Sequence, residues 1–297
     1  MSRTASAIAN SVLDPTEAIV GYNGGRLSTS GGVASSAVLA FQGTIGPYIE
    51  VATRRVNITS PLECQFTDNL VLANGDPDAV GASDLTLYYA FVSYNGFLRL
   101  SETAPSFSNE AVGLYLSDTP GGRLWRFVGW VRTGVGVFED SPTRRCIINA
   151  ENRKPRPIFY CPGYNNNNAQ TTYSHTSATW APLNGVATPV VVIAGGTVVG
   201  ELDVSLSASC SAVGAGGATI GILASGFSNE RAAATLPGAG VNHSASCRLL
   251  PIIDGPSVIT LEPQAVSSAA STFIADAARS GAAADPAVTV LTGWVLG

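Results

Sequence analysis

The chain has 297 residues, enough for two domains of ordinary size, each with its own core. Charged residues make up only 12%, against roughly 25% in a typical soluble protein, while hydrophobic residues reach 45%. This combination excludes a disordered chain and indicates a surface that is partly covered by copies of the chain or by neighbouring subunits. The net charge of −5 and the scattered arginines exclude nucleic acid as the main partner, because phosphate binding needs clustered Arg and Lys.

Residues 1–45 are small and polar, and glycine pairs interrupt any periodicity. We expect extended chain that orders only on a partner surface, as in an anchoring arm; a disordered tail is the alternative. The apolar residues Ile8, Val12 and Leu13 are the expected docking residues of this arm. The segment lacks the apolar core of a secretory signal, and no stretch approaches the roughly 20 apolar residues that span a bilayer. We therefore expect folding in a cytoplasm and no membrane insertion.

From residue 47, short β-favouring runs alternate with turn residues. The clearest signal is Leu85–Val92 followed by Asn95-Gly96 and Leu98–Leu100, which predicts a hairpin with a type I′ turn. Turns at this spacing are typical of a sandwich or barrel. Further strands are predicted at Tyr48–Val51, Arg55–Thr59, Gly113–Leu116, Leu124–Arg132, Gly136–Phe138 and Cys146–Ile148.

A second β region follows the polar, proline-flanked junction Glu151–Pro157. Apolar and polar residues alternate from Leu202 to Ala208, the pattern of a strand with one buried face. The Ala-rich segment Ser267–Arg279 predicts the one helix, although its β-branched residues also allow a strand. Further strands are predicted at Val190–Ile193, Thr219–Leu223, Ala245–Leu249, Val258–Leu261 and Val288–Leu296, enough for a jelly roll.

These patterns predict an all-β protein with two sandwich or jelly-roll-like domains behind an extended N-terminal arm. The arm covers residues 1–45, the first β domain residues 46–155, and the C-terminal jelly roll residues 156–297. The final run of the chain is apolar, and its residues Leu291, Trp294 and Leu296 are the expected contacts between copies of the chain. Closed cyclic symmetry covers the edge strands of a sheet, which would otherwise pair with further copies without limit. We therefore expect a homotrimer.

No set of residues predicts catalysis. His175 and His243 are interpreted as exposed loop residues, and no G-x-S-x-G turn presents a nucleophile. Glycan hydrolysis needs two carboxylates that face a cleft. Glu139-Asp140 and Glu201/Asp203 are the closest acidic pairs, and the second pair falls on the polar, solvated face of a predicted strand. The sequence therefore indicates a protein that is not an enzyme.

No metal or cofactor site is predicted either. Gly75-Asp76-Pro77-Asp78 lacks the later glutamate of a calcium loop and is interpreted as a turn. The cysteines have no zinc spacing, are odd in number and contain no CxxC pair, so we expect free thiols. They are Cys64, Cys146, Cys161, Cys210 and Cys247.

A carbohydrate site is predicted around the asparagine tract, where amides and aromatic rings occur together. Amide hydrogen bonds and ring stacking suit a sugar, while a polar loop that bonds locally is the alternative. The expected residues are Tyr164, Asn165, Asn166, Asn167, Asn168, Tyr173 and Trp180. The aromatic residues Trp125, Phe127 and Trp130 are interpreted instead as core and hairpin packing.

The segment Leu85–Asp140 resembles a β-rich domain of fibre and other accessory structural proteins of tailed phages. The similarity lies in the aromatic hairpin, in Ser101-Glu102-Thr103-Ala104-Pro105, and in Arg123-Leu124-Trp125-Arg126-Phe127-Val128-Gly129-Trp130. The second half, with PGYNNNNAQTTYSHTSATWAPLNG and a last strand that ends near Trp294, resembles C-terminal jelly rolls that trimerise.

This resemblance implies a virion component: a head or tail fibre, spike or decoration protein, assembled in the host bacterial cytoplasm. Its expected partners are further copies of itself, a capsid, neck or tail protein, and glycans of the host surface. Two alternatives stay open. One is a carbohydrate-binding adhesion module outside a virion. The other is a glycan-degrading tailspike, against which stand the missing carboxylate pair and the missing β-helical repeat.

Overall fold

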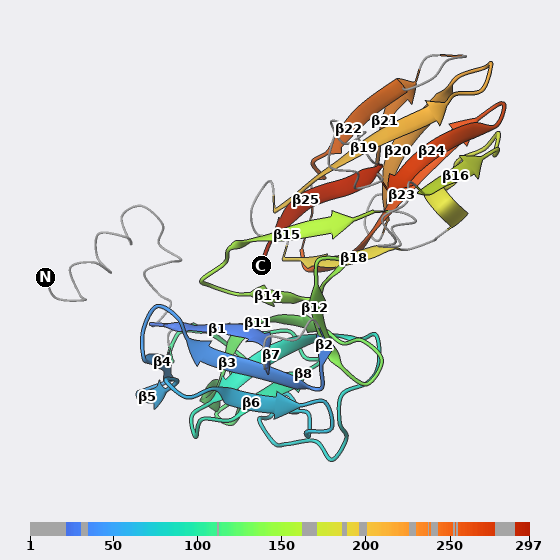
Figure 1. The fold of residues 1–297 in the computed structure, drawn as a ribbon. Helices are drawn as coiled ribbons and strands as arrows, with labels where there is room; N and C mark the ends of the chain where they lie inside the picture. Colours follow the sequence, from blue (N-terminus) through green and yellow to red (C-terminus); the bar gives the residue numbers. More distant parts are fainter. Residues whose placement is uncertain are drawn as a thin grey trace, which may run out of the picture. The chain divides into compact units, whose positions relative to one another are not determined.

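The computed structural model describes residues 22–30, 35–111, 113–161, 171–185, 189–195, 201–225, 230–236, 238, 243–251, 253, 255–276 and 289–297 (Figure 1). These residues form β-strands and short 3-10 turns without an α-helix, which confirms the predicted all-β fold. Consequently, none of the described segments is a helix long and apolar enough to cross a bilayer. The chain divides into unit 1, Met1–Ser141 with Cys146–Arg153, and unit 2, Pro142–Arg145 with Lys154–Gly297.

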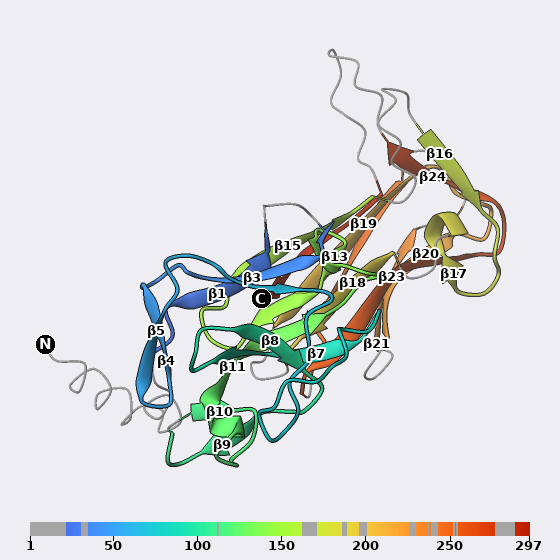
Figure 2. The same ribbon diagram turned by 90° about the horizontal axis from the view of Figure 1, so that it is seen from below.

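Unit 1 contains two antiparallel sheets (Figure 1). The smaller has the order β1 (Gly25–Thr29), β3 (Val38–Gly43), β6 (Leu62–Gln65). The larger has the order β8 (Leu98–Ser101), β7 (Leu87–Ser93), β11 (Trp125–Arg132), β10 (Gly113–Tyr115), β9 (Ser106–Ser108), and β14 (Ile147–Asn149) also pairs with β11. The hairpin of β4 (Tyr48–Val51) and β5 (Arg54–Asn57) belongs to this unit (Figure 2). The pair of β2 (Ser35–Ser36) and β12 (Phe138–Ser141) completes it (Figure 1).

The core of unit 1 lies between these sheets. Alternate residues of a strand point to the same face of its sheet, and the inward-facing residues of both sheets form one buried cluster. Leu27 and Phe41 from the smaller sheet are buried in one cluster with Tyr88 from the larger sheet. On the larger sheet, Phe127 packs edge-on against Trp130, with ring centroids 4.8 Å apart. Both residues are buried, so their interpretation as packing residues agrees with the structure.

The predicted arm is wrong for residues 22–30 and 35–43. This part of the chain forms β1, β2 and β3, and Leu27, Leu39 and Phe41 are fully buried. The glycine pairs suggested a segment that cannot build a core, whereas these three side chains supply one face of a sheet. Residues 1–21, with Ile8, Val12 and Leu13, lie outside the described residues.

The predicted hairpin is confirmed between β7 and β8, but its turn type is not I′. Gly96 has φ +84°, whereas Asn95 is not among the residues with positive φ. Ser93 N–H donates to Phe97 O at 2.8 Å, and Gly96 N–H donates to Ser93 O at 2.9 Å. This is a three-residue loop with glycine in the left-handed position. Ser93 Oγ stabilises it by accepting a hydrogen bond from Phe97 N–H at 2.8 Å.

Unit 2 is a sandwich of two sheets (Figures 1 and 2). In one sheet β13 (Arg144–Arg145), β18 (Val190–Ala194), β23 (Ser257–Ser267), β20 (Ala218–Ser225) and β21 (Glu230–Leu236) follow one another, and β17 (Ala181–Pro182) pairs with β23. In the other, β19 (Leu202–Ala212) pairs with β22 (His243–Leu249), β24 (Ser271–Asp276) and β25 (Val290–Leu296). The strands β15 (Pro155–Tyr160) and β16 (Thr171–His175) pair with β25 and β24.

The helix predicted at Ser267–Arg279 is absent from the described part of that segment. Ser271–Asp276 is the strand β24, the alternative that the β-branched residues left open. Phe273 of this strand is fully buried in the core of unit 2. Pairing with two neighbouring strands and burial of an aromatic side chain outweigh the helix propensity of the alanines. Residues 277–279 lie outside the described residues.

Candidate functional site

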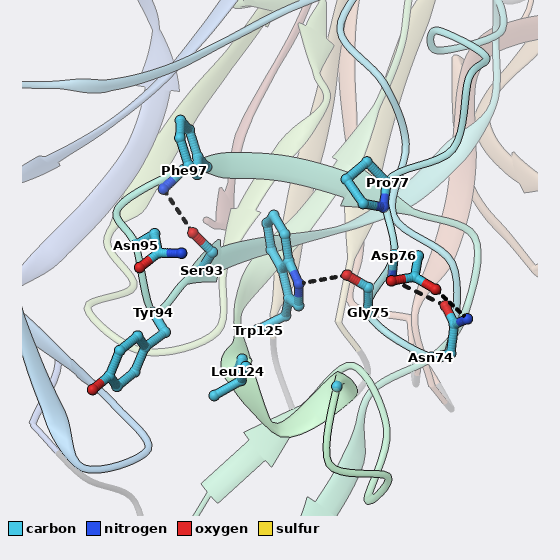
Figure 3. A pocket seen from close by; sticks show the side chains of 11 residues that line it. Asn74, Gly75, Asp76, Pro77, Ser93, Tyr94, Asn95, Phe97, Leu124 and Trp125 are labelled. Atoms are coloured by element: carbon cyan, nitrogen blue, oxygen red, sulfur yellow. Dashed lines mark hydrogen bonds between the residues drawn. The ribbon is translucent and has the colours of Figure 1, made fainter.

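A pocket of about 350 Å³ lies in unit 1 where three turns meet (Figure 3). The turns come from distant parts of the sequence: residues 74–77, the β7–β8 hairpin, and the segment that leads into β11 through the 3-10 turn Gly122–Leu124. This volume is at the small end of the range of pockets that hold small ligands. The lining residues are Asn74, Gly75, Asp76, Pro77, Ser93, Tyr94, Asn95, Phe97, Gly121, Leu124 and Trp125.

Trp125 lies at the centre of the pocket, between the hairpin and the 74–77 turn (Figure 3). Its side chain is 8% exposed, and its indole Nε1–H donates to Gly75 O at 3.0 Å. Its backbone pairs with Ser93 of β7. One hydrogen bond and one strand pair therefore fix the ring against both neighbouring turns. The interpretation of Trp125 as a packing residue was incomplete, because its ring also lines the pocket.

The 74–77 turn is closed by its own hydrogen bonds. Asp76 N–H donates to Asn74 Oδ1 at 3.0 Å, and Asn74 Nδ2 donates to Asp76 Oδ2 at 2.7 Å. Gly75 has φ +90°, which a side chain would strain. A Cβ placed on Gly121 would lie 1.8 Å from Asn74 O, so two backbone segments touch here. The turn predicted at this position is present, and the close contact holds it beside Trp125.

The rim of the pocket is aromatic and aliphatic. Phe97 is 53% exposed at the hairpin, and Leu124 is 44% exposed on the opposite turn. The backbone joins the two turns, because Tyr94 N–H donates to Leu124 O at 2.7 Å. The Arg99 guanidinium lies 5.5 Å from the centroid of the Phe97 ring, and the Arg54 guanidinium lies 5.1 Å from that of Tyr94. These rings therefore combine an exposed surface with a fixed position.

The polar side chains of the pocket can form hydrogen bonds with a ligand. Asp76 is the one lining residue with a carboxylate, and Asn74, Ser93 and Asn95 add amide and hydroxyl groups. A second carboxylate, a histidine and a cysteine are all missing from the lining residues. General acid–base and covalent catalysis need such partners. In addition, no cluster of three or more potential metal ligands occurs among the described residues.

The carbohydrate site predicted around the asparagine tract is only partly described. Tyr164 and Asn165–Asn168 lie outside the described residues. Tyr173 belongs to β16 and pairs with Phe273 of β24. Trp180 is half-buried, and its ring lies against β20, where a Cβ on Gly221 would come within 3.0 Å of it. The described part of this region therefore leaves the site a prediction.

His175 is buried rather than exposed in a loop. It is the last residue of β16, it is 6% exposed, and its ring meets Phe273 edge-on at 6.3 Å. Burial lowers the pKa of His175, which favours the neutral imidazole. The interpretation of His175 as an exposed loop residue is wrong because β16 extends to this residue and pairs with β24. The other histidine, His243, begins β22.

Glu201 is also buried, at 1% exposure, although the sequence placed it on a solvated strand face. Its carbonyl accepts a hydrogen bond from Leu296 N–H at 2.7 Å, which holds the start of β19 against β25. Asp203 binds Arg248 through two hydrogen bonds of 2.8 and 2.6 Å, and these bonds lower the pKa of Asp203. In the other acidic pair, Asp140 is buried and Glu139 is half-buried. Neither pair presents two exposed carboxylates.

The expected trimer residues fall on opposite faces of β25. Leu291 is fully buried in the core of unit 2, so this residue is wrong as a contact between copies. Trp294 and Leu296 are half-buried and keep part of their surface. Successive residues of the strand point to opposite faces, and apolar residues occur on both of them.

All five cysteines are free in the structure, as predicted. Four are buried and Cys161 is half-buried. Burial raises the pKa of the Cys64 and Cys210 thiols to about 12. These two thiols are therefore protonated and unreactive in the folded chain.

No protein-family model matches the chain, and a search of curated proteins finds no match. Among solved structures, one similar chain is a carbohydrate-binding module of the β-sandwich superfamily, 10% identical, with a TM-score of 0.20 over 84% of this chain and 95% of that one. Another is from infectious bursal disease virus, Gx strain, 12% identical, with a TM-score of 0.22 over 92% of this chain and 75% of that one. Scores this low do not establish a common fold.

Proposed function

We propose that this chain is a non-enzymatic binding component of a virus particle that contacts carbohydrate through the pocket of unit 1. One observation carries the proposal: a fixed tryptophan and an exposed phenylalanine lie beside amides and a single carboxylate. A sugar ring has apolar C–H faces and a polar hydroxyl edge, and a site of this composition matches both. The absence of a catalytic pair from the lining favours retention of the glycan over its hydrolysis.

The particle is the second element of the proposal. The resemblance of Leu85–Asp140 to accessory structural proteins of tailed phages supports it, as does the charged fraction of only 12%. Unit 2 would hold copies of the chain together as a homotrimer, with Trp294 and Leu296 as contacts. A capsid, neck or tail protein would hold the N-terminal segment. The chain would thus present its glycan pockets on the surface of a head or tail fibre, spike or decoration.

A glycan array tests the binding function with the purified full chain. Phe97→Ala removes the exposed ring from the rim and should weaken glycan binding about tenfold, the effect of losing one large apolar contact. Phe107→Ala is the matched control, because Phe107 is a 42% exposed phenylalanine on β9 that does not line the pocket. Equal loss of binding in both variants, or binding to no glycan, would contradict the proposal.

Two further measurements separate this proposal from its rivals. Incubation with bound polysaccharides should release no new reducing ends; release would favour a glycan-degrading tailspike. Mass spectrometry of purified particles should detect the chain as a stoichiometric component. A chain that binds glycans but is absent from particles would instead be an adhesion module outside a virion.

A further inference from the structure

We infer that the pocket of unit 1 selects uncharged saccharides and disfavours acidic ones, such as those that carry sialic or uronic acids. This inference rests on the proposed function and concerns the same site. It follows from the sign of the charge inside the pocket, from the hydrogen-bonding groups left for a ligand, and from the rigidity of the three turns.

The charge of the pocket comes from Asp76, an exposed residue of the 74–77 turn. No arginine, lysine or histidine belongs to the lining, so an acidic sugar would meet a carboxylate without a lining cation. The guanidinium groups of Arg54 and Arg99 stack on rim rings instead, and Arg99 is also bound to Asp68 at 3.1 Å. Like charges repel more strongly near a protein surface than in bulk water, because the low-dielectric protein screens them less. This repulsion disfavours an anionic ligand over a neutral one of the same shape.

The free hydrogen-bonding capacity suits hydroxyl groups. Asp76 Oδ2 accepts one bond, from Asn74 Nδ2, and a carboxylate has about four acceptor positions. Ser93 Oγ accepts from Phe97 N–H, which leaves its own O–H to donate. Asn95 contributes an amide that both donates and accepts. Sugar hydroxyls that donate to the carboxylate would make charge-assisted bonds, the stronger kind, whereas the carboxylate of an acidic sugar cannot donate.

The site is formed before a ligand arrives. The Trp125 indole is bound to Gly75 O, and Gly121 lies in backbone contact with Asn74. A rigid pocket binds a ligand without the free-energy cost of ordering loops. In such a pocket the Asp76 carboxylate also keeps its position when a ligand enters. The position of Asp76 relative to the Trp125 ring is therefore fixed, and the pocket can discriminate between neutral and acidic saccharides.

Isothermal titration of the full chain with matched pairs of saccharides tests the inference. Suitable probes are lactose and sialyllactose, and neutral oligosaccharides with the same oligosaccharides carrying a glucuronic acid. Neutral members should bind at least about tenfold more tightly than their acidic partners. The difference should shrink in 1 M salt, where the screening length falls to about 3 Å.

The variant Asp76→Asn keeps the size of the side chain and an acceptor for Asn74 Nδ2, but removes the charge. It should weaken binding of neutral saccharides about tenfold and bring the neutral and acidic affinities close together. Glu102→Gln is the control, since it removes one exposed charge outside the pocket and should leave both affinities unchanged. Equal or tighter binding of acidic saccharides, or an unchanged ratio in Asp76→Asn, overturns this inference and leaves the proposed function standing. Binding of no saccharide overturns both.

Discussion

Replacement of Arg126 by methionine should strongly destabilise unit 1. Arg126 lies on β11 and is 1% exposed, although its side chain ends in a guanidinium group. Its guanidinium donates to Tyr22 O at 3.0 Å, to Glu50 O at 2.6 Å and to Glu151 Oε1 at 2.9 Å. It therefore ties three separate segments to the larger sheet. Methionine fills a similar volume but leaves these acceptors without their donor.

The expected loss follows from the partners that remain. Removal of one member of a buried ion pair costs about 3–5 kcal/mol, because the other charge stays buried and uncompensated. Glu151 keeps 32% of its side chain exposed, so we expect the lower end, about 3 kcal/mol. Stabilities of whole domains are only about 5–15 kcal/mol, so this loss is a large fraction of the total.

The loss should also depend on pH. Burial raises the pKa of Glu151, and Arg126 opposes that rise. Without Arg126 the pKa of Glu151 rises further in the folded chain. When the pKa of a group is higher in the folded than in the unfolded chain, the free energy of unfolding decreases as the pH rises through the folded pKa. The destabilisation by Arg126→Met should therefore be larger at neutral pH than in acid, where Glu151 is protonated.

Urea unfolding followed by tryptophan fluorescence measures the loss, and hydrogen exchange by mass spectrometry assigns it to a unit. Peptides from β7 and β11 should exchange faster in Arg126→Met, while peptides from β19 should not change. Arg132→Met is the control, because Arg132 ends the same strand and is only half-buried. A loss below about 1 kcal/mol, or an equal loss in both variants, would refute the role given to the buried guanidinium.

Three further predictions follow from particular contacts. All five thiols should react in denaturant without reductant, and in the folded chain Cys161 should react first while Cys64 and Cys210 stay protected; titration of three or fewer thiols would reveal a disulfide. Gly121→Ala should weaken glycan binding at least tenfold, because its Cβ would displace the 74–77 turn, and unchanged affinity on the array would show that this turn is not part of the site. Light scattering of the full chain should give three times the monomer mass, and Trp294→Ser should lower it; a stable monomer at micromolar concentration would contradict the trimer.

Short β-favouring runs bounded by turn residues revealed most of the strands, and period-two alternation revealed part of β19 and β22. The predicted strand Tyr48–Val51 has the same bounds in the structure, and the alternation from Leu202 to Ala208 lies within β19. In such strands one face is buried and the other is not, so the sequence itself carries the information. The signal fails where apolar residues occur on both faces of a strand. Leu291 and Trp294 show this, because both are apolar, yet Leu291 is buried in the core and Trp294 is only half-buried.

The pocket was not predicted, for a different reason. Asp76, Asn95 and Trp125 were each interpreted within their own local pattern, as turn, hairpin and packing residue. Those local interpretations were largely right, but the site arises because three turns far apart in sequence meet. Only the polar residues beside Gly75, together with the aromatic residues around Asn95-Gly96, offered a signal. Likewise, burial of Arg126 depends on carbonyl groups of distant segments, which residue spacing does not reveal.

Competition for adsorption tests the central claim most directly. Host cells are treated with the purified chain and then exposed to intact particles, and unbound particles are counted. The account predicts that the unchanged chain and Phe107→Ala reduce adsorption, because both keep the pocket, and that Phe97→Ala does so about tenfold less effectively. If Phe97→Ala competes as well as the unchanged chain, or if the unchanged chain does not compete, the pocket of unit 1 is not the surface by which a virus particle holds its host.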